Sequence, residues 1–556
     1  MKTPGQRFWL LLKPDSKEIY QVYTYAFFKG IIALSLPIGI QSIINLIQGG
    51  SVSASWMILV FIVTLGIAMG GYMQLMQMRI TETIQQKIFA RTAFDFTYRI
   101  PKIKLEEIYK HYVPELMNRF FDVLTLQKSL SKIIIDFSTS ILQIIFGLIL
   151  LSLYHPFFIL FSILLLILVY TIIMLTSKKG LETSLDESKY KYKVVSWLEE
   201  LARTKDTFKL AGITNLAELK TDERVTGYLE SRESHFKILQ KQYKLLLLFK
   251  IIVALGLLVV GGLLVLDQQM NIGQFVAAEI IILLVIDSTE KIILNLENVF
   301  DIFTSLEKLG QVTDFKLDTQ SDTSSLNHDI KEPIRVEIKD VTFTYWGRTK
   351  MVLKNVSYNF KANHSYCITG QNGSGKSTLL HLISGLYQAQ SGSMCINDLP
   401  ILNYNIPKLY QVIGNSLAEE TIFEGTLLEN ISLGRDFVKI EDVLWAIKKV
   451  FLSEYVKDLP NGLDTPIDIA GDKLSKSIIQ RIIIARSIAN KPKLILFENN
   501  IDLIEEIERN KIIEFLTDKS NGWTLISSSN NKYLQEKSDF VIYMNEGEIV
   551  DTKILK

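Results

Sequence analysis

The chain has 556 residues, which is too long for a single core, so two or more domains are expected. Hydrophobic residues make up 48% of the chain and the mean hydropathy is +0.22, which is slightly too apolar for a soluble protein. The net charge of +1 excludes a broadly basic surface and so argues against nucleic acid as a partner. The two cysteines, Cys367 and Cys395, have neither metal-ligand spacing nor a disulfide framework, and a reducing cytosolic setting fits them.

Long apolar runs crowd into the part of the chain before about residue 305. A membrane-spanning helix needs about 20 mostly apolar residues. The third apolar run is the least regular at its start, where Lys132 and Asp136 intrude, and the first contains Pro37, which a membrane helix tolerates when its neighbours satisfy the freed backbone groups. Six stretches are therefore predicted to span a membrane: residues 20–46, 56–78, 131–153, 157–176, 246–266 and 273–294.

The orientation of these spans follows from the placement of lysine and arginine. Three short loops carry neither lysine nor arginine: residues 49–55, 154–156 and 267–271. Two long stretches are dense in charged residues: 79–130 and 177–245. The pattern predicts a multi-pass protein of the cytoplasmic (inner) membrane, in contact with lipid, with both termini in the cytosol. The alternative, a bundle of buried helices in a soluble protein, does not explain why six spans obey one charge rule.

The composition changes after the last span. Residues 311–333 are rich in Asp, Ser, Thr and Lys and lack apolar periodicity, which is typical of a linker. From Ile334 onward, short apolar strands alternate with helices, a pattern that predicts an α/β domain. The expected architecture is an all-α transmembrane domain over residues 1–310, a linker, and a cytosolic α/β domain over residues 334–556.

The strongest motif is residues 370–377, GQNGSGKS, which fits the phosphate-binding P-loop at every fixed position. A predicted strand precedes it and a predicted helix follows it. Backbone N–H groups of such a loop wrap the phosphates, Lys376 would reach the β and γ phosphates, and the Ser377 hydroxyl would ligand Mg²⁺. The predicted phosphate-binding residues are Gly370, Asn372, Gly373, Ser374, Gly375, Lys376, Ser377 and Thr378.

Other segments resemble the ATP-binding-cassette (ABC) transporter family, whose fold is a six-helix transmembrane domain fused to a P-loop NTPase domain. In the α/β domain, four runs carry the resemblance. In the membrane domain, residues 272–277 resemble the equivalent segment of type I secretion and peptide-exporting members of the family. The four runs are residues 341–345 (VTFTY), 423–431 (FEGTLLENI), 459–465 (LPNGLDT) and 480–487 (QRIIIARS). The resemblance implies ATP and Mg²⁺ as cofactors. It also places Tyr345 at the position where an aromatic residue of the family stacks on adenine. The alternative is that Tyr345 is an aromatic strand residue that packs in the domain core.

The chain departs from this family at several catalytic positions. Counted from matching segments, the Q-loop glutamine falls on Ala418 and the switch histidine on Asn530. The strand that should end in Asp-Glu ends in Phe497 and Glu498, so Glu498 is the candidate general base. The signature Leu-Ser-Gly-Gly-Gln reads LSKSI over residues 474–478, which keeps Ser475 but replaces both glycines.

Two functions follow from the resemblance and its departures. The first is an exporter subunit that couples ATP binding, with or without slow hydrolysis, to outward transport of a peptide, protein or amphiphile. The alternative is a catalytically impaired ATP-binding component that regulates or scaffolds a transport or secretion complex. Because an ABC nucleotide site forms between two such domains, two chains are expected: a homodimer is favoured, a heterodimer with another ABC subunit is the second option, and a periplasmic adaptor is a further candidate partner.

Overall fold

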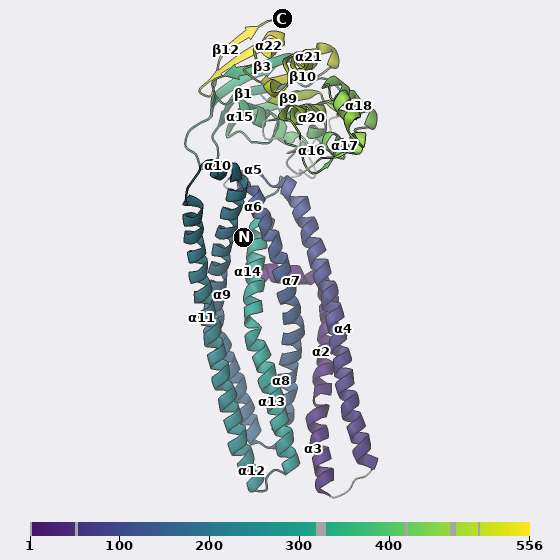
Figure 1. Cartoon of the computed structure of the whole chain (residues 1–556), viewed down its shortest axis with the longest axis vertical. Coiled ribbons are helices and arrows are strands. Elements are labelled where there is room, and N and C mark those ends of the chain that lie inside the picture. Colours follow the sequence, from purple (N-terminus) through teal and green to yellow (C-terminus); the bar gives the residue numbers. More distant parts are fainter. Residues whose placement is uncertain are drawn as a thin grey trace. The chain divides into compact units, whose positions relative to one another are not determined.

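The computed structural model describes residues 3–49, 54–109, 111–318, 330–417, 421–467, 474–498 and 501–555. The chain divides into two compact units, Met1–Leu317 and Asp318–Lys556, which are treated separately below (Figure 1). Ala418, the position counted for the Q-loop glutamine, lies outside the described residues.

The first unit is built from helices, of which α4, α9 and α11 are the longest. Its α-helices are α1 (Pro4–Leu12), α2 (Ser16–Ala33), α3 (Ser35–Gln48), α4 (Ala54–Arg99), α5 (Leu105–Ile108), α6 (Val113–Met117), α7 (Asp122–Lys132), α8 (Ser138–Tyr154), α9 (Phe157–Arg203), α10 (Lys205–Leu210), α11 (Leu216–Gly256), α12 (Gly262–Leu266), α13 (Ile272–Leu294) and α14 (Leu296–Thr313). Helices α9 and α11 pack side by side along most of their length (Figure 1).

Six helical stretches of this unit are long and apolar enough to cross a membrane. Each of the six predicted spans lies within one of them, so the predicted six-helix membrane unit is confirmed. The helices continue well past the apolar stretches: α4 extends to Arg99 and α9 to Arg203, and α11 starts at Leu216, about 30 residues before its apolar part. A large part of these helices is therefore predicted to lie in cytosolic water.

The irregular positions noted in the sequence have local structural consequences. Helix α2 ends at Ala33, four residues before Pro37, because a proline ring has no N–H to donate to the carbonyl four residues earlier and clashes with it. The irregular start of the third span contains a π-helical turn, Ile133–Phe137, and Asp136 lies within it. A second π-helical turn, Leu257–Gly261, separates α11 from α12.

The second unit is an α/β domain, as predicted. Its strands are β1 (Val336–Phe343), β2 (Leu353–Phe360), β3 (Ser365–Gly370), β4 (Ser391–Ile396), β5 (Leu399–Pro400), β6 (Ile413–Ser416), β7 (Gly425–Thr426), β8 (Pro466–Ile467), β9 (Leu494–Glu498), β10 (Thr524–Ser528), β11 (Phe540–Asn545) and β12 (Glu548–Ile554). Its α-helices are α15 (Lys376–Ile383), α16 (Ile406–Val412), α17 (Leu427–Ser432), α18 (Ile440–Lys449), α19 (Ser453–Asp458), α20 (Lys476–Ile488), α21 (Glu506–Thr517) and α22 (Lys532–Lys537).

The central six-stranded sheet has the order β12-β11-β3-β10-β9-β6, and a four-stranded sheet has the order β2-β1-β4-β5. Strands β3, β10 and β9 are parallel neighbours, with Ser528 paired to both Ile368 and Glu498. Since parallel strands end at the same sheet edge, the loops that follow β3, β9 and β10 meet there. The P-loop follows β3 at this edge, so the sheet topology positions the candidate site.

Candidate nucleotide-binding site

The P-loop joins β3 to α15 and has a backbone that glycine alone adopts readily. Gly370, Gly373 and Gly375 have φ values of +150°, +81° and +98°. A Cβ atom on Gly370 would lie 2.1 Å from the Met544 carbonyl oxygen on the neighbouring strand β11. Beside these glycines, Asn372 is exposed and Ser374 is buried. The loop therefore has the tight, N–H-lined shape that the motif predicted.

Lys376 begins α15 and bends back over the loop. Its ammonium group donates hydrogen bonds to the carbonyl oxygens of Gly370 and Gln371, at 2.9 and 2.8 Å. Burial lowers the pKa of Lys376, while the charge of Glu498 opposes that shift. The cation is thus held at the loop by two neutral carbonyl groups, and phosphate oxygens are stronger partners for it.

The Ser377 hydroxyl donates a hydrogen bond to the carboxylate of Glu498 at the end of β9. Glu498 is buried, and the preceding residue, Phe497, is 1% exposed. Successive strand residues point to opposite faces, so Phe497 enters the apolar cluster that contains Ile495 while Glu498 faces the P-loop.

This contact bears on two interpretations made from the sequence. The resemblance to the family places Phe497 at the position of the acid that helps to hold Mg²⁺, and Glu498 at the position of the general base. P-loop NTPases hold Mg²⁺ with the P-loop Ser or Thr and with an Asp at the end of a neighbouring strand. Glu498 is the carboxylate that contacts Ser377, and Phe497 is a core residue. The general-base role of Glu498 stays a prediction, and its contact with Ser377 adds the role of a Mg²⁺-shell acid as an alternative.

Asn530 follows β10 at the same sheet edge. Its side-chain oxygen accepts a hydrogen bond from Thr369 Oγ1 at 2.9 Å and a long one from the Gly370 N–H at 3.5 Å. Asn530 is exposed. The position counted for the switch histidine is therefore adjacent to the P-loop, with an amide that cannot carry a proton as imidazole does.

Tyr345 lies just after β1 and is half-buried. Its hydroxyl shares a hydrogen bond of 2.9 Å with Thr378, in the first turn of α15. Its ring packs edge-on against Phe343 and Tyr387, with centroids 5.2 and 5.8 Å apart. Tyr345 thus combines core packing with a position next to the P-loop helix, and its stacking on adenine stays a prediction.

The signature segment lies at the start of α20. Ser475 caps that helix by accepting a hydrogen bond from the Ile478 N–H at 3.3 Å, and both Ser475 and Lys476 are exposed. Within the described part of the chain, Ser475, Lys476 and Ser477 form no hydrogen bond or ion pair with the P-loop of their own domain. Ser475 and Lys476 are therefore accessible from outside the domain, whereas the Ser477 hydroxyl is buried.

Sequence reasoning missed one buried polar group that shapes this region. Arg486 donates to the carbonyl oxygens of Asn430 and Thr421, at 2.8 and 2.9 Å. Asn430 in turn accepts from the Phe423 N–H at 3.0 Å. Together these bonds anchor the segment that begins at Thr421 to α20. Arg486 and Asn430 both lie in runs that resemble the family, but a resemblance alone does not reveal that they touch.

The residues at the sheet edge fit a magnesium nucleotide in part. Positive-φ glycines, Lys376 and the N-terminus of α15 suit a triphosphate. Ser377 and Glu498 offer the hard oxygen donors that Mg²⁺ prefers. Within the described ranges, no group of three or more His, Cys, Asp or Glu side chains could hold a metal ion.

A six-helix membrane unit followed by a P-loop domain defines a membrane transporter with its own nucleotide-binding domain. Two family models match the chain, "ABC transporter" over residues 353–500 and "ABC transporter transmembrane region" over residues 23–288. The chain belongs to the ABC transporter family, with one transmembrane domain and one ATP-binding domain.

Individual relatives agree with this assignment. The chain is 31% identical over 217 residues to the uncharacterized ABC transporter ATP-binding protein YfiB of Bacillus subtilis, covering 39% of this chain and 38% of that one. It is 29% identical over 221 residues to the ATP-dependent permease MDL1 of Candida albicans, covering 39% of this chain and 32% of that one. The chain spans about two-fifths of the length of the first curated relatives it matches. The structure of a bacterial Atm1-family ABC exporter with ATP bound matches 97% of this chain and 95% of its own, with a TM-score of 0.85 and 17% identity, which establishes the shared fold.

Proposed function

We propose that this chain is one subunit of a dimeric exporter in the cytoplasmic membrane, and that it couples ATP binding to outward movement of a peptide, protein or amphiphile. The observation that carries this proposal is the P-loop, whose glycine backbone, Lys376 and Ser377 are all in place beside the Glu498 carboxylate. Its fusion to six membrane-spanning helices supports transport as the use of that nucleotide.

The same site supports slow hydrolysis. Glu498 is used as the acid of the Mg²⁺ shell, since its carboxylate meets the Ser377 hydroxyl. It is then not available as the base that activates water. Asn530 cannot supply that role because its amide does not take up a proton at neutral pH. ATP binding, ordered by Lys376, Ser377 and Glu498, is therefore retained, while the chemical step lacks a carboxylate or imidazole in the base position among the residues that the structure describes.

Assembly follows from the signature segment. Ser475 and Lys476 are exposed at the start of α20 and do not bond their own P-loop. A complete ABC nucleotide site takes its signature segment from a second chain. A second copy of this chain can supply that segment, so a homodimer needs no other protein to complete the site. Crosslinking in native membranes should give a dimer of this chain, and a partner of another sequence in the crosslinked band would replace the homodimer by a heterodimer.

The transport proposal is tested in sealed inside-out vesicles that contain the full-length chain. A library of fluorescent peptides and amphiphilic dyes is offered on the outer, formerly cytosolic, side with MgATP. We expect at least one compound to accumulate inside, and Lys376→Ala to abolish that accumulation. Accumulation that is unchanged in Lys376→Ala, or that occurs equally without nucleotide, would contradict ATP-coupled export.

A further inference from the structure

A short segment at the end of α14, residues 313–317, is bonded to several distant parts of the first unit, and we call it the clasp. The chain passes directly from the clasp to Asp318, the first residue of the second unit. Segments that only connect two units usually lie exposed, with few contacts to either unit. The contacts of the clasp therefore indicate a role besides connection.

One set of contacts joins the clasp to the connection between α4 and α5. The Lys104 N–H donates to the carbonyl oxygen of Lys316 at 3.0 Å. Beside this bond, Ile103, which is buried, pairs with Leu317 as in an antiparallel sheet. The Lys316 ammonium lies 3.5 Å from the Glu107 carboxylate, but this ion pair contributes little because Lys316 is exposed. The clasp is therefore held here mainly by its backbone.

Two arginines bring further helices to the same segment. Arg99, the last residue of α4, donates to the carbonyl oxygen of Thr313 at 2.9 Å. Arg7 of α1 donates to the carboxylates of Asp314 and Glu307, each at 2.7 Å, and its side chain is only 10% exposed. Charge-assisted hydrogen bonds of this kind are stronger than those between neutral groups. The clasp is thus bonded to α1 as well as to α4.

A shared apolar core lies beside the clasp. It is formed by residues of α1, α4, α7 and α14, among them Leu12, Phe96, Leu126 and Val312, which are all buried. Phe315 of the clasp packs against this core. Among the described residues, α9 and α11 contribute no side chain to it. The bonds of the clasp and the apolar core therefore hold the same helices together.

These helices lead into three of the membrane spans: α1 comes before span one, α4 contains span two, and α14 continues span six. From the contacts above, we propose that the clasp holds the cytosolic ends of spans one, two and six together as one body throughout the nucleotide cycle. Movement that passes along the chain from the ATP-binding unit then reaches these three spans together. The clasp belongs to the membrane unit alone, so this inference goes beyond the export proposal and does not depend on the cargo.

The variant Lys104→Pro removes the N–H that donates to the clasp, and proline suits the backbone at that position. Lys104 has φ −57° and ψ 130°, which proline adopts. Ile103 has φ −67° and ψ 131°, the extended form that is favoured before proline. Lys104→Ala keeps the N–H and is the matched control. Arg99→Ala, which removes the bond to Thr313, is the second variant if the proline variant does not fold.

Amide hydrogen exchange is measured by mass spectrometry on the full-length chain in lipid nanodiscs, with and without MgATP. In the wild type, we expect residues 310–318 to exchange slowly and at the same rate in both conditions, while protection of residues 370–378 reports that ATP is bound. In Lys104→Pro, exchange of residues 310–318 should rise about threefold or more, the effect of losing one backbone hydrogen bond.

Exchange in α1 should also rise in Lys104→Pro, because Arg7 joins α1 to the same segment. Lys104→Ala should match the wild type, and residues 235–245 of α11 should be unchanged in every variant. The rise in α1 distinguishes a clasp from a local hydrogen bond, since a local bond affects only its own neighbours.

Three results would overturn the proposal. The first is faster exchange of residues 310–318 when ATP binds to the wild type, which would show that the clasp opens. The second is faster exchange in Lys104→Pro that is confined to residues 100–108, or that Lys104→Ala shows equally. The third is unchanged exchange of residues 310–318 in both Lys104→Pro and Arg99→Ala. If residues 370–378 show no protection, the export proposal fails instead, and the comparison of variants without nucleotide still decides whether the clasp exists.

Discussion

Lys376 is the side chain on which we expect nucleotide affinity to depend most directly. It is held by two backbone carbonyl groups of the P-loop, which phosphate oxygens would replace as charge-assisted partners. A hydrogen bond to a charged group contributes about 1.5–3 kcal/mol, which corresponds to roughly tenfold to hundredfold in affinity. Lys376→Ala should therefore weaken ATP binding by at least tenfold in a fluorescent-nucleotide titration. Lys457→Ala, at an exposed lysine of the same domain, is the control and should bind as the wild type does.

Glu498 distinguishes the two interpretations of the strand that it ends. If Glu498 helps to hold Mg²⁺, ATP affinity should depend on Mg²⁺ through this residue. The reason is that its carboxylate contacts Ser377, the expected protein ligand of the ion. In Glu498→Gln, the gain in ATP affinity on adding Mg²⁺ should fall at least threefold relative to the wild type, while affinity in EDTA changes little. If the gain in ATP affinity on adding Mg²⁺ is the same in Glu498→Gln as in the wild type, Glu498 does not hold Mg²⁺, and the general-base interpretation is favoured.

Phe497 is a core residue, so replacing it with the family's aspartate should not repair the enzyme. The ring is 1% exposed in an apolar cluster that includes Ile482 and Leu525. Losing a buried Phe costs about 3–5 kcal/mol, and an unpaired buried carboxylate adds to that cost. Phe497→Asp should lower the unfolding temperature of the protein without raising ATP turnover, whereas Phe497→Leu should lower it less. A Phe497→Asp protein with wild-type stability and faster turnover would show that this side chain faces the nucleotide.

At the scale of elements, close approach of two helices makes one glycine indispensable. A Cβ on Gly180 of α9 would lie 2.4 Å from the ring of Phe300 on α14, and that ring is itself buried. Gly262 of α12, by contrast, has nothing within 4 Å of its Cβ position. Gly180→Ala should destabilise the membrane unit by about 1–3 kcal/mol through overpacking. Gly262→Ala should be neutral or stabilising by up to about 1 kcal/mol, because alanine favours helix.

The paired glycine variants are compared by thermal unfolding in lipid nanodiscs. Opposite signs, with Gly180→Ala melting below and Gly262→Ala at or above the wild type, would support the packing of α9 on α14. Equal shifts for both variants would contradict it, since helix propensity alone affects both positions alike.

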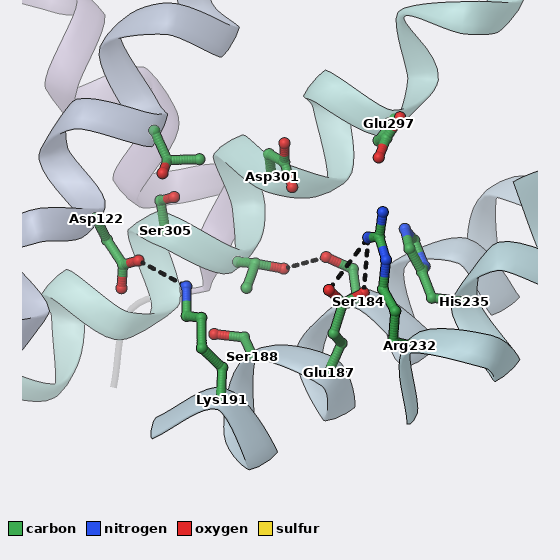
Figure 2. Close-up of a pocket in the computed structure, with 12 residues that line it drawn as sticks. Asp122, Ser184, Glu187, Ser188, Lys191, Arg232, His235, Glu297, Asp301 and Ser305 are labelled. Carbon is green, nitrogen blue, oxygen red and sulfur yellow. Dashed lines mark hydrogen bonds and ion pairs between the residues drawn. The ribbon is translucent and has the colours of Figure 1, made fainter. Parts of the chain in front are cut away.

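The elements themselves were largely predictable because their signals are local. Apolar length predicted six spans, and the fixed spacing of residues 370–377 predicted the strand, loop and helix of the P-loop. Contacts between distant segments were not predictable in this way. The pairing of Ser377 with Glu498 depends on the register of β9, where a shift of one residue exchanges the faces of Phe497 and Glu498. A polar cavity lined by α7, α9, α11 and α14 was not predictable either, since its Ser, Thr and acidic residues look like solvent-facing surfaces until the helices are packed (Figure 2).

For the whole molecule, we propose that the chain keeps the residues that bind a nucleotide and has altered those that hydrolyse it. Gly370, Gly373, Gly375 and Lys376 retain the geometry of a phosphate site. The signature segment instead carries Lys476 and Ser477 in place of glycines, and the switch position is Asn530. Because such groups act together in hydrolysis, restoring one of them should recover little. An exporter of this kind would change state mainly on binding and releasing ATP.

The most direct test is a comparison of ATP affinity with steady-state ATP turnover for the full-length chain reconstituted in lipid. We expect saturable ATP binding that Lys376→Ala weakens at least tenfold. We also expect a turnover number at least tenfold below that of an ABC exporter that keeps both the Asp-Glu strand end and the switch His, measured alongside, since each tenfold in rate corresponds to about 1.4 kcal/mol of barrier. Turnover by the unmodified chain at the rate of the comparison exporter would contradict the account.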